Sequence, residues 1–539
     1  MFLLAVPSHA QKVENKVWIC GVPKIPKYSA EEWKQKYEQD LLTKPKLVVI
    51  KQQNQRIFWA YNDTTKDTYQ VVAVLRNDST QHARVWVELS INNSVNQNTV
   101  DYWAREFSEV IYERLTNAFG NPPDVDNDAK INILILDIPG RGTAGYFWPA
   151  QEEAYDRTEI IYIDYQDGDP DVIAHEFAHM IHYNYDHTTI IPPNLAEEDW
   201  VDEGIADYAI WVVYNHHETA GHRDAFINNP DTSLTSDFVG DLSDLPKYGA
   251  AYLFFLYLSE KYGGTQLIRN ILQDKANGIE GIENHLPGVT FEDVFKNWII
   301  ANYLDGPTQN DDPSNPLWRY DSLDIQVSIT NSISFTGQPD STSDSVNQWA
   351  ADYYKINIEN PQADNFYYKL EYPLLQLAKD FWSALILMND TGPTIIEKSI
   401  LINQTTNFTQ SKEYQRALKQ AEEKGINVTK SILPETPPIN ANNTVTNAEK
   451  YQEIILIISP LDKSGDYTLK VEPISDKHKT TNSLSQGEKA VYVIPVNIFG
   501  QPNLWNAYES NGDVFVSVWW ESSRNLNVKL TLASGKQGD

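Results

Sequence analysis

The stretch His175-Glu176-Phe177-Ala178-His179 places two histidines four residues apart, with a glutamate directly after the first. On a helix, positions four apart lie on one face. The two imidazoles can then bind one Zn²⁺, and the adjacent carboxylate can take a proton from a water activated by the metal. A pattern this short also arises by chance, and a histidine pair can simply lie half-buried on an amphipathic helix. The residues around the motif therefore have to decide between these interpretations.

The sequence around the motif predicts a buried helix. Asp169-Pro170 lies just upstream, as expected for a helix N-cap followed by proline at the first helical position. The following residues are apolar on most faces of the helix: Val172, Ile173, Ala174, Phe177, Ala178, Met180 and Ile181. A helix that is apolar nearly all round belongs in a core. Buried histidines need partners, and a metal ion is one.

A second acidic motif supplies a candidate third ligand. Glu203 follows His179 after enough chain for a loop and a return on a second helix, and Asp207 lies one helical turn later on the same face. In a His₂Glu site, Glu203 would complete the ligand set and leave the fourth position open for water. Asp207 would accept the free ring N–H of a ligating histidine. The alternative is that both acids are ordinary exposed residues of an acidic protein.

The two motifs together resemble those of the gluzincins, the thermolysin-like superfamily, which combines H-E-x-x-H with a later E-x-x-x-D. The wider resemblance is to secreted hyicolysin-type peptidases of bacteria and archaea, and less closely to immune inhibitor A-type peptidases. It covers about residues 45–305 and runs through Asp124–Asp128, Ile131–Asp137, Gly145–Phe147, Ile160–Asp164 and Tyr248–Phe254. It implies an α+β zincin-type domain, a mixed sheet with active-site helices. It also implies Zn²⁺ at His175, His179 and Glu203, with Glu176 as the catalytic carboxylate.

The metzincin pattern does not fit. It requires a glycine three residues after the second histidine and a further histidine three residues later. Those places hold His182 and Tyr185. His182 is more often a surface residue or a partner of a ligand in such a position, so it is left out of the predicted ligand set, as is His187.

The predicted chemistry is peptide-bond hydrolysis. The metal acidifies water and polarises the scissile carbonyl. Glu176 takes the proton and later delivers it to the leaving amine. The oxyanion that develops needs a further donor, and Tyr248 is the candidate, on a helix that also carries Tyr252. Aromatic packing explains Tyr248 equally well.

Two apolar segments predict the sheet of the catalytic domain, because Ile131–Leu136 and Ile160–Ile163 have the pattern of buried strands. The resemblance implies that Gly142–Trp148, which contains glycines and aromatic residues, forms a substrate-lining edge. A substrate would then add beside this edge as an extra strand.

Asp124, Asp126 and Asp128 follow the opening of a D-x-D-x-D calcium loop. The sixth position is Ala129 rather than glycine, and the twelfth is Ile135 rather than glutamate. Either a loose Ca²⁺ site or a plain acidic turn fits this departure from the EF-hand.

The charge and the amino-acid composition of the chain exclude some classes of binding partner. Across 539 residues there are 74 acidic and 43 basic side chains, for a net charge of −31. Such a chain should repel nucleic acid and anionic membrane surfaces. No run approaches the ~18 apolar residues of a membrane span. The single cysteine, Cys20, excludes an internal disulfide framework.

The first ten residues and the sequence after residue 305 predict an exported protein with several domains. Met1–Ala10 looks like the end of a signal peptide, which predicts an extracellular or cell-surface protein. After a Pro/Asp/Asn-rich linker, short strands separated by turns predict a β-sandwich, which could contact a cell surface or wall. The predicted division is 1–10 signal remnant, 11–97 N-terminal β region, 98–305 zincin domain, 306–317 linker, 318–475 β-sandwich and 476–539 small β unit.

The leading interpretation is a secreted zinc endopeptidase that acts on proteins or peptides. Two alternatives stay open. One is a catalytically silent surface or adhesion protein that keeps a zincin scaffold. The other is a zinc hydrolase of another amide.

Overall fold

The computed structural model describes most of the chain. The described ranges are 17–44, 54–140, 142–186, 197–215, 220–306, 315–360, 365–371, 381–390, 392–400, 444–445, 447–461, 463–474, 491–498, 501–510 and 513–519. The predicted signal remnant 1–10 and His187 lie outside these ranges, as does most of the predicted linker.

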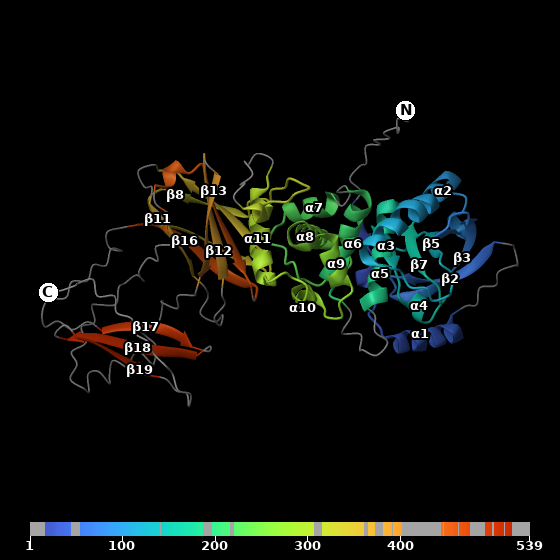
Figure 1. Ribbon diagram of the computed structural model, residues 1–539, viewed down its shortest axis with the longest axis horizontal. Coiled ribbons are helices and arrows are strands. Elements are labelled where there is room, and N and C mark those ends of the chain that lie inside the picture. The colour runs from blue at the N-terminus through green and yellow to red at the C-terminus, as the bar shows by residue number, and fades with distance from the viewer. Residues whose placement is uncertain are drawn as a thin grey trace.

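A seven-stranded mixed sheet lies between residues 19 and 164, in the order β1-β6-β7-β5-β4-β3-β2. Its strands are β1 (Ile19–Cys20), β2 (Gln55–Asn62), β3 (Asp67–Asn77), β4 (Ala83–Glu88), β5 (Ile131–Leu136), β6 (Thr143–Phe147) and β7 (Ile160–Asp164). Figure 1 labels its strands β2, β3, β5 and β7. β4, β5 and β7 run parallel, β2 and β3 add antiparallel at one side, and β6 pairs antiparallel with β7. The predicted strands at 131–136 and 160–163 are confirmed. The segment expected at the sheet edge forms β6, but β6 lies between β1 and β7, because the two residues of β1 pair with its outer side. Residues from both sides of the predicted boundary at 97 build this one sheet.

The sheet is buried on both faces because its central strands are apolar throughout. Successive side chains of β5 point to opposite faces. Ile133 and Ile135 join the core that contains Phe177 of α5, whereas Leu134 and Leu136 join the core on the other face. Continuous apolar runs of this kind are typical of parallel strands covered on both sides.

Helix α1 (Ala30–Thr43) precedes β2, and helices occupy most of the region from 97 to 304. The helices of that region are α2 (Gln97–Glu106), α3 (Tyr112–Phe119), α4 (Ala150–Glu153), α5 (Pro170–Asp186), α6 (Asp199–Tyr214), α7 (Ala220–Ile227), α8 (Leu245–Leu258), α9 (Gly264–Leu272), α10 (Gly278–Glu283) and α11 (Phe291–Leu304). Single π-helical turns, Phe107–Ile111 and Ser259–Gly263, continue α2 and α8. Short 3₁₀ segments lie at Val22–Lys24, Leu89–Ile91, Leu242–Asp244, Pro316–Trp318 and Ala448–Lys450.

The helix that carries the histidine motif begins as its sequence predicts. The Asp169 carboxylate accepts hydrogen bonds from the backbone N–H groups of Asp171 (3.0 Å) and Val172 (3.2 Å). This is N-capping with Pro170 in the first turn. The helix is buried from Val172 to His182. No described helix is long and apolar enough to cross a membrane.

The C-terminal part is built of β-sheets. A five-stranded sheet has the order β13-β12-β15-β10-β8, and a four-stranded sheet the order β14-β11-β16-β9. Their strands are β8 (Asn331–Phe335), β9 (Asp340–Val346), β10 (Asp352–Ile358), β11 (Phe366–Glu371), β12 (Phe381–Asn389), β13 (Gly392–Ile400), β14 (Thr444–Val445), β15 (Glu453–Pro460) and β16 (Gly465–Pro473). Side chains from both sheets share one buried core. A separate three-stranded sheet contains β17 (Val491–Ile498), β18 (Gln501–Ser510) and β19 (Asp513–Trp519).

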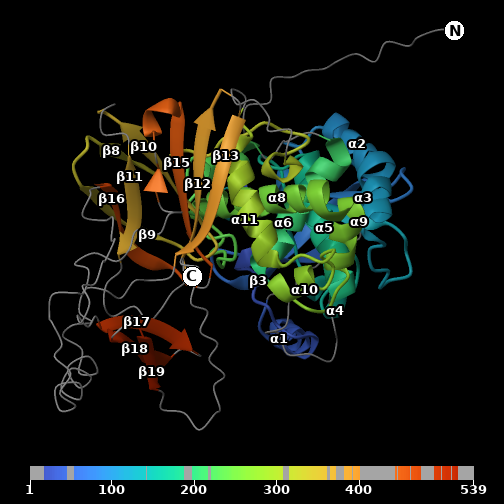
Figure 2. The ribbon, with the colours of Figure 1, turned by 60° about the vertical axis from the view of Figure 1, so that its left-hand side comes forward.

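Helix α11 joins the helical region to the five-stranded sheet (Figure 2). The ring of Trp349 packs edge-on between Phe291 and Phe295, at centroid distances of 4.9 and 5.1 Å. The Tyr353 hydroxyl donates to the backbone carbonyl of Ile299 at 2.7 Å. Aromatic pairs of this kind add about 0.5–1.5 kcal/mol each beyond the area they bury.

Asp352, at the start of β10, predicts a pH-dependent stability. The fully buried carboxyl accepts a hydrogen bond from Tyr467 (2.6 Å), and burial, with Asp231 and Asp344 nearby, raises its pKa to about 8. The folded protein therefore keeps a proton that the unfolded chain loses above its ordinary pKa of 3.8. The free energy of unfolding should fall as pH rises between these two values, by at most about 1.4 kcal/mol per pH unit.

Asp352→Asn should flatten this slope, because the variant has no carboxyl to titrate at that position. Thermal unfolding followed by tryptophan fluorescence across the window measures it. Asp466→Asn, an exposed residue of the adjacent sheet, is the control. An unchanged slope in Asp352→Asn would contradict the assignment.

Candidate metal centre

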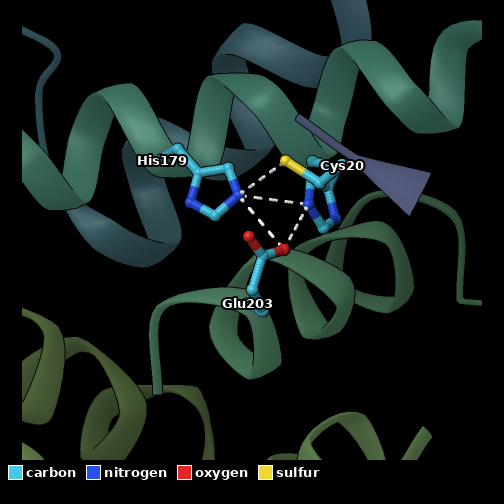
Figure 3. A group of neighbouring side chains, drawn as sticks. Cys20, His179 and Glu203 are labelled. Carbon is cyan, nitrogen blue, oxygen red and sulfur yellow. Dashed lines mark hydrogen bonds and ion pairs between the residues drawn. The ribbon is translucent and has the colours of Figure 1, made fainter. Parts of the chain in front are cut away.

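Helices α5 and α6 bring three predicted ligands together (Figure 3). His175 and His179 lie one turn apart on α5, and their Nε2 atoms are 3.1 Å from each other. Glu203 comes from α6, with Oε2 at 3.1 Å from His175 Nε2 and 3.5 Å from His179 Nε2. All three side chains are buried. The structure thus assembles the set that the two motifs predict.

The other ring nitrogens are held by carboxylates. His175 Nδ1 lies 2.9 Å from Asp207 Oδ1, and His179 Nδ1 lies 3.0 Å from Asp202 Oδ2. The Asp207 carboxylate can only accept a hydrogen bond, so this contact favours a proton on His175 Nδ1, which leaves the Nε2 lone pair facing the shared centre. This is how the partners of a metal-binding histidine fix its tautomer. His179 Nδ1 lies within ion-pair distance of Asp202 but forms no hydrogen bond of ordinary geometry among the described residues.

The charge balance of the centre favours a cation. Burial lowers the pKa of His175, but its hydrogen bonds to Asp207 and other partners raise it well above the ordinary value. Burial raises the pKa of Glu203, yet the facing His179 and His175 hold it below its ordinary value. Burial also acts against the charged form of Asp207, but His222 and His175 lower its pKa to about 2. Anionic oxygens therefore surround the two imidazoles, and either protons or a metal ion can supply the compensating positive charge.

The donor set fits zinc. Tetrahedral zinc with bonds of about 2.0–2.2 Å to nitrogen or oxygen and about 2.3 Å to sulfur separates its donor atoms by about 3.3–3.6 Å. The three donor separations of 3.1, 3.1 and 3.5 Å lie close to this range. In addition, Glu203 Oε1 is buried and has no hydrogen-bond partner in the part of the chain described.

Three residues at the centre were not identified from the sequence. Asp202 holds both His179 and His182, whose Nδ1 lies 2.7 Å from Asp202 Oδ1. His222 of α7 places Nδ1 at 2.7 Å from Asp207 Oδ2 and Nε2 at 2.8 Å from the Trp18 carbonyl. The third is Cys20. Asp202 could have been found from its place directly before Glu203, whereas no local pattern marks His222.

Cys20 lies at the centre although it comes from the start of the described chain. On β1, its Sγ is 3.6 Å from His179 Nε2 (Figure 3). It also lies 3.7 Å from Glu176 Oε2. Its donor atom and those of His175, His179 and Glu203 all lie within 4.8 Å of one another. In the sequence, Cys20 bears only on disulfide formation and on lipid attachment, for which its context is poor, and a lone thiol far from the motif gives no sign of its position.

Glu176, the predicted base, lies beside the three predicted ligands. It is fully buried, and burial raises its pKa to about 7, with Glu203 adding to the effect. Its Oε2 accepts a weak hydrogen bond from the Cys20 thiol, and Oε1 finds no partner among the described residues.

Tyr248 lies where the centre meets β1. Its hydroxyl accepts from the Cys20 backbone N–H at 3.3 Å and lies 3.5 Å from the Cys20 carbonyl oxygen. The ring stacks on His222, with centroids 4.6 Å apart, and packs edge-on against Phe238. The side chain is therefore packed as an aromatic and also presents a donor to a backbone at this position. The role predicted for Tyr248 stays a prediction.

The predicted calcium loop receives no support. Asp128 forms an ion pair with Arg84 at 2.5 Å rather than joining the other two acids. Asp124 and Asp126 approach the buried Glu159 instead, and Asp126 Oδ2 accepts a hydrogen bond from Thr158 at 2.7 Å. The calcium site predicted at Asp124, Asp126 and Asp128 stays a prediction.

The chain resembles a known peptidase. It is 29% identical over 289 residues to neutral metalloprotease ShpI of Staphylococcus hyicus. The match takes in 46% of this chain and 62% of that protein, so the chain covers less than two thirds of its relative. No protein-family model matches the chain. The similarity supports a relationship to the thermolysin-like metallopeptidases.

Proposed function

We propose that the protein is a secreted zinc metalloendopeptidase whose metal is held by His175, His179 and Glu203. The convergence of the Nε2 atoms of two buried imidazoles and one buried carboxylate on a common point carries this proposal. The similarity to a neutral metalloprotease supports it independently.

Zinc at this centre would supply a Lewis acid that acidifies water and polarises a carbonyl. Glu176, directly beside the ligands on α5, removes the proton of the attacking water and returns it to the leaving amine. Asp207 and Asp202 hold the two ligating rings in place. Tyr248 would donate to the developing oxyanion, since its hydroxyl already lies within 3.5 Å of a backbone carbonyl oxygen at this position.

Strand β6 would bind the substrate. Gly145 on this strand is so close to the centre that a Cβ would lie 3.0 Å from Glu176 Cγ. A peptide added along β6 would therefore pass directly over the catalytic carboxylate. This arrangement suits protein or peptide substrates bound in extended form, and the C-terminal sheets could contact a cell surface or wall.

The test is zinc content combined with casein hydrolysis, with and without a chelator. Because Cys20 lies against the ligands, both the wild-type chain and Cys20→Ala are assayed. We expect one zinc per chain, hydrolysis by Cys20→Ala, loss of hydrolysis on chelation and recovery when zinc is restored. Zinc binding without hydrolysis of any peptide would favour the silent surface protein instead. Turnover of small amides but not of peptide libraries would favour the other zinc hydrolase.

A further inference from the structure

The segment around Cys20 occupies the edge of the sheet that a substrate would need. β1 pairs parallel with β6, which would otherwise be the outer strand on that side. Ile19 N–H donates to the Gly142 carbonyl and Gly21 N–H to the Gly145 carbonyl, both at 2.9 Å. An exposed strand edge is a template for one added strand. Here the residues of β1 take the place that an added substrate strand would occupy beside β6.

The thiol lies where a fourth ligand belongs. Cys20 Sγ is 3.6 Å from His179 Nε2, close to the about 3.6 Å that separates sulfur from nitrogen around tetrahedral zinc. Two further observations point to the same place. Oε1 of Glu176 and Oε1 of Glu203 are buried without hydrogen-bond partners among the described residues. The Val22 backbone N–H also donates to Sγ at 3.3 Å, which stabilises negative charge on the sulfur.

We propose that Cys20 Sγ is the fourth zinc ligand of a latent form, in which β1 covers the substrate edge and the thiolate closes the position that hydrolysis requires. The proposal rests on the zinc centre proposed above. A ligating thiol must lose its proton, and the Glu176 carboxylate, with Oε2 at 3.7 Å from Sγ, is placed to accept it. The same contact occupies the catalytic carboxylate. One residue therefore blocks both the metal and the general base.

The contacts flanking Cys20 hold it in register. Trp18 packs edge-on against His175 and His222, at centroid distances of 5.2 and 4.9 Å. A Cβ on Gly21 would lie 3.0 Å from Thr143 Cγ2 and 3.1 Å from Tyr146 Cβ, so the close approach to β6 favours glycine.

Two lysines fasten the chain that follows. Lys24 Nζ lies 2.5 Å from Asp63 Oδ2, with both side chains largely buried. Lys27 Nζ lies 2.6 Å from Asp199 Oδ1, at the start of the helix that carries Glu203. The segment is thus tied to both sides of the centre, and its displacement would free the metal position and the strand edge together.

The decisive experiment replaces zinc by Co²⁺ in the purified full chain. A thiolate ligand gives a near-ultraviolet sulfur-to-cobalt charge-transfer band, whereas nitrogen and oxygen ligands alone do not. We expect this band in the wild-type chain, its loss in Cys20→Ala and Cys20→Ser, and its retention in Ser29→Ala. Ser29 caps α1 in the same segment without contacting the centre.

Peptide turnover provides the second measurement. Because β1 would still pair with β6 in Cys20→Ala, this measurement combines Cys20→Ala with Lys24→Ala and Lys27→Ala, which removes the thiol and both ion pairs of the segment. If fewer than about one molecule in ten has the segment displaced, this triple variant should raise turnover by about tenfold or more. Cobalt bound without the charge-transfer band, or equal turnover by the wild-type chain and the triple variant, would overturn the latent form and leave the zinc peptidase intact. Failure of the chain to bind Co²⁺ or zinc at all would overturn the proposed function as well.

Discussion

Glu176→Gln is expected to bind zinc as well as the parent chain and to hydrolyse peptides at least about 100-fold more slowly, the lower end of the range for general acid–base catalysis. Glutamine keeps the shape of the buried side chain but cannot take a proton from water. Glu176 is no part of the three-residue ligand set, so metal binding should survive.

The measurement combines zinc stoichiometry with kcat on a fluorogenic peptide, in a Cys20→Ala background so that the thiol does not mask the effect. Glu159→Gln, the same substitution at another fully buried glutamate, is the matched control. Its turnover should stay near that of the parent. Substantial turnover by Glu176→Gln would remove Glu176 from the mechanism.

The parts of the centre that could be predicted are those encoded by local spacing. The one-turn separation of His175 from His179, and of Glu203 from Asp207, follows from helix geometry, and the structure places these four side chains together. Asp169 and Pro170 fixed the start of the helix in the same local way.

The parts that could not be predicted depend on pairing between distant segments. β1 is only two residues long and becomes a strand because its backbone bonds to Gly142 and Gly145. A strand of two residues is too short to show the alternation of apolar and polar residues by which strands are recognised in a sequence. Likewise, the residues of β4 alternate as a strand should, but nothing in them reveals that β4 pairs with β5. The predicted boundary at residue 97 therefore separates two strands that belong to one sheet.

The third-ligand prediction for Glu203 cannot be tested on the wild-type chain alone. Glu203→Ala leaves His175, His179 and Cys20, three donors within 4.8 Å of one another, and zinc bound to these would hide the loss of the carboxylate. In the wild-type background we therefore expect Glu203→Ala to retain measurable zinc. In the Cys20→Ala background it should lose more than about 100-fold in zinc affinity, beyond the about 10–100-fold caused by removing an outer-shell partner.

Competition with a chromogenic chelator measures these affinities. Glu203→Gln is examined beside Glu203→Ala because it preserves the packing of α6 while removing the charge, and circular dichroism checks that both fold. Glu292→Ala on the exposed face of α11 controls for the loss of one acid from a chain of net charge −31. Equal zinc affinity of Cys20→Ala with and without Glu203→Ala would exclude Glu203 as a ligand. A large loss of zinc affinity that occurs only when Cys20→Ala and Glu203→Ala are combined would show that the thiol and the carboxylate bind the same metal. The latent centre requires this relationship.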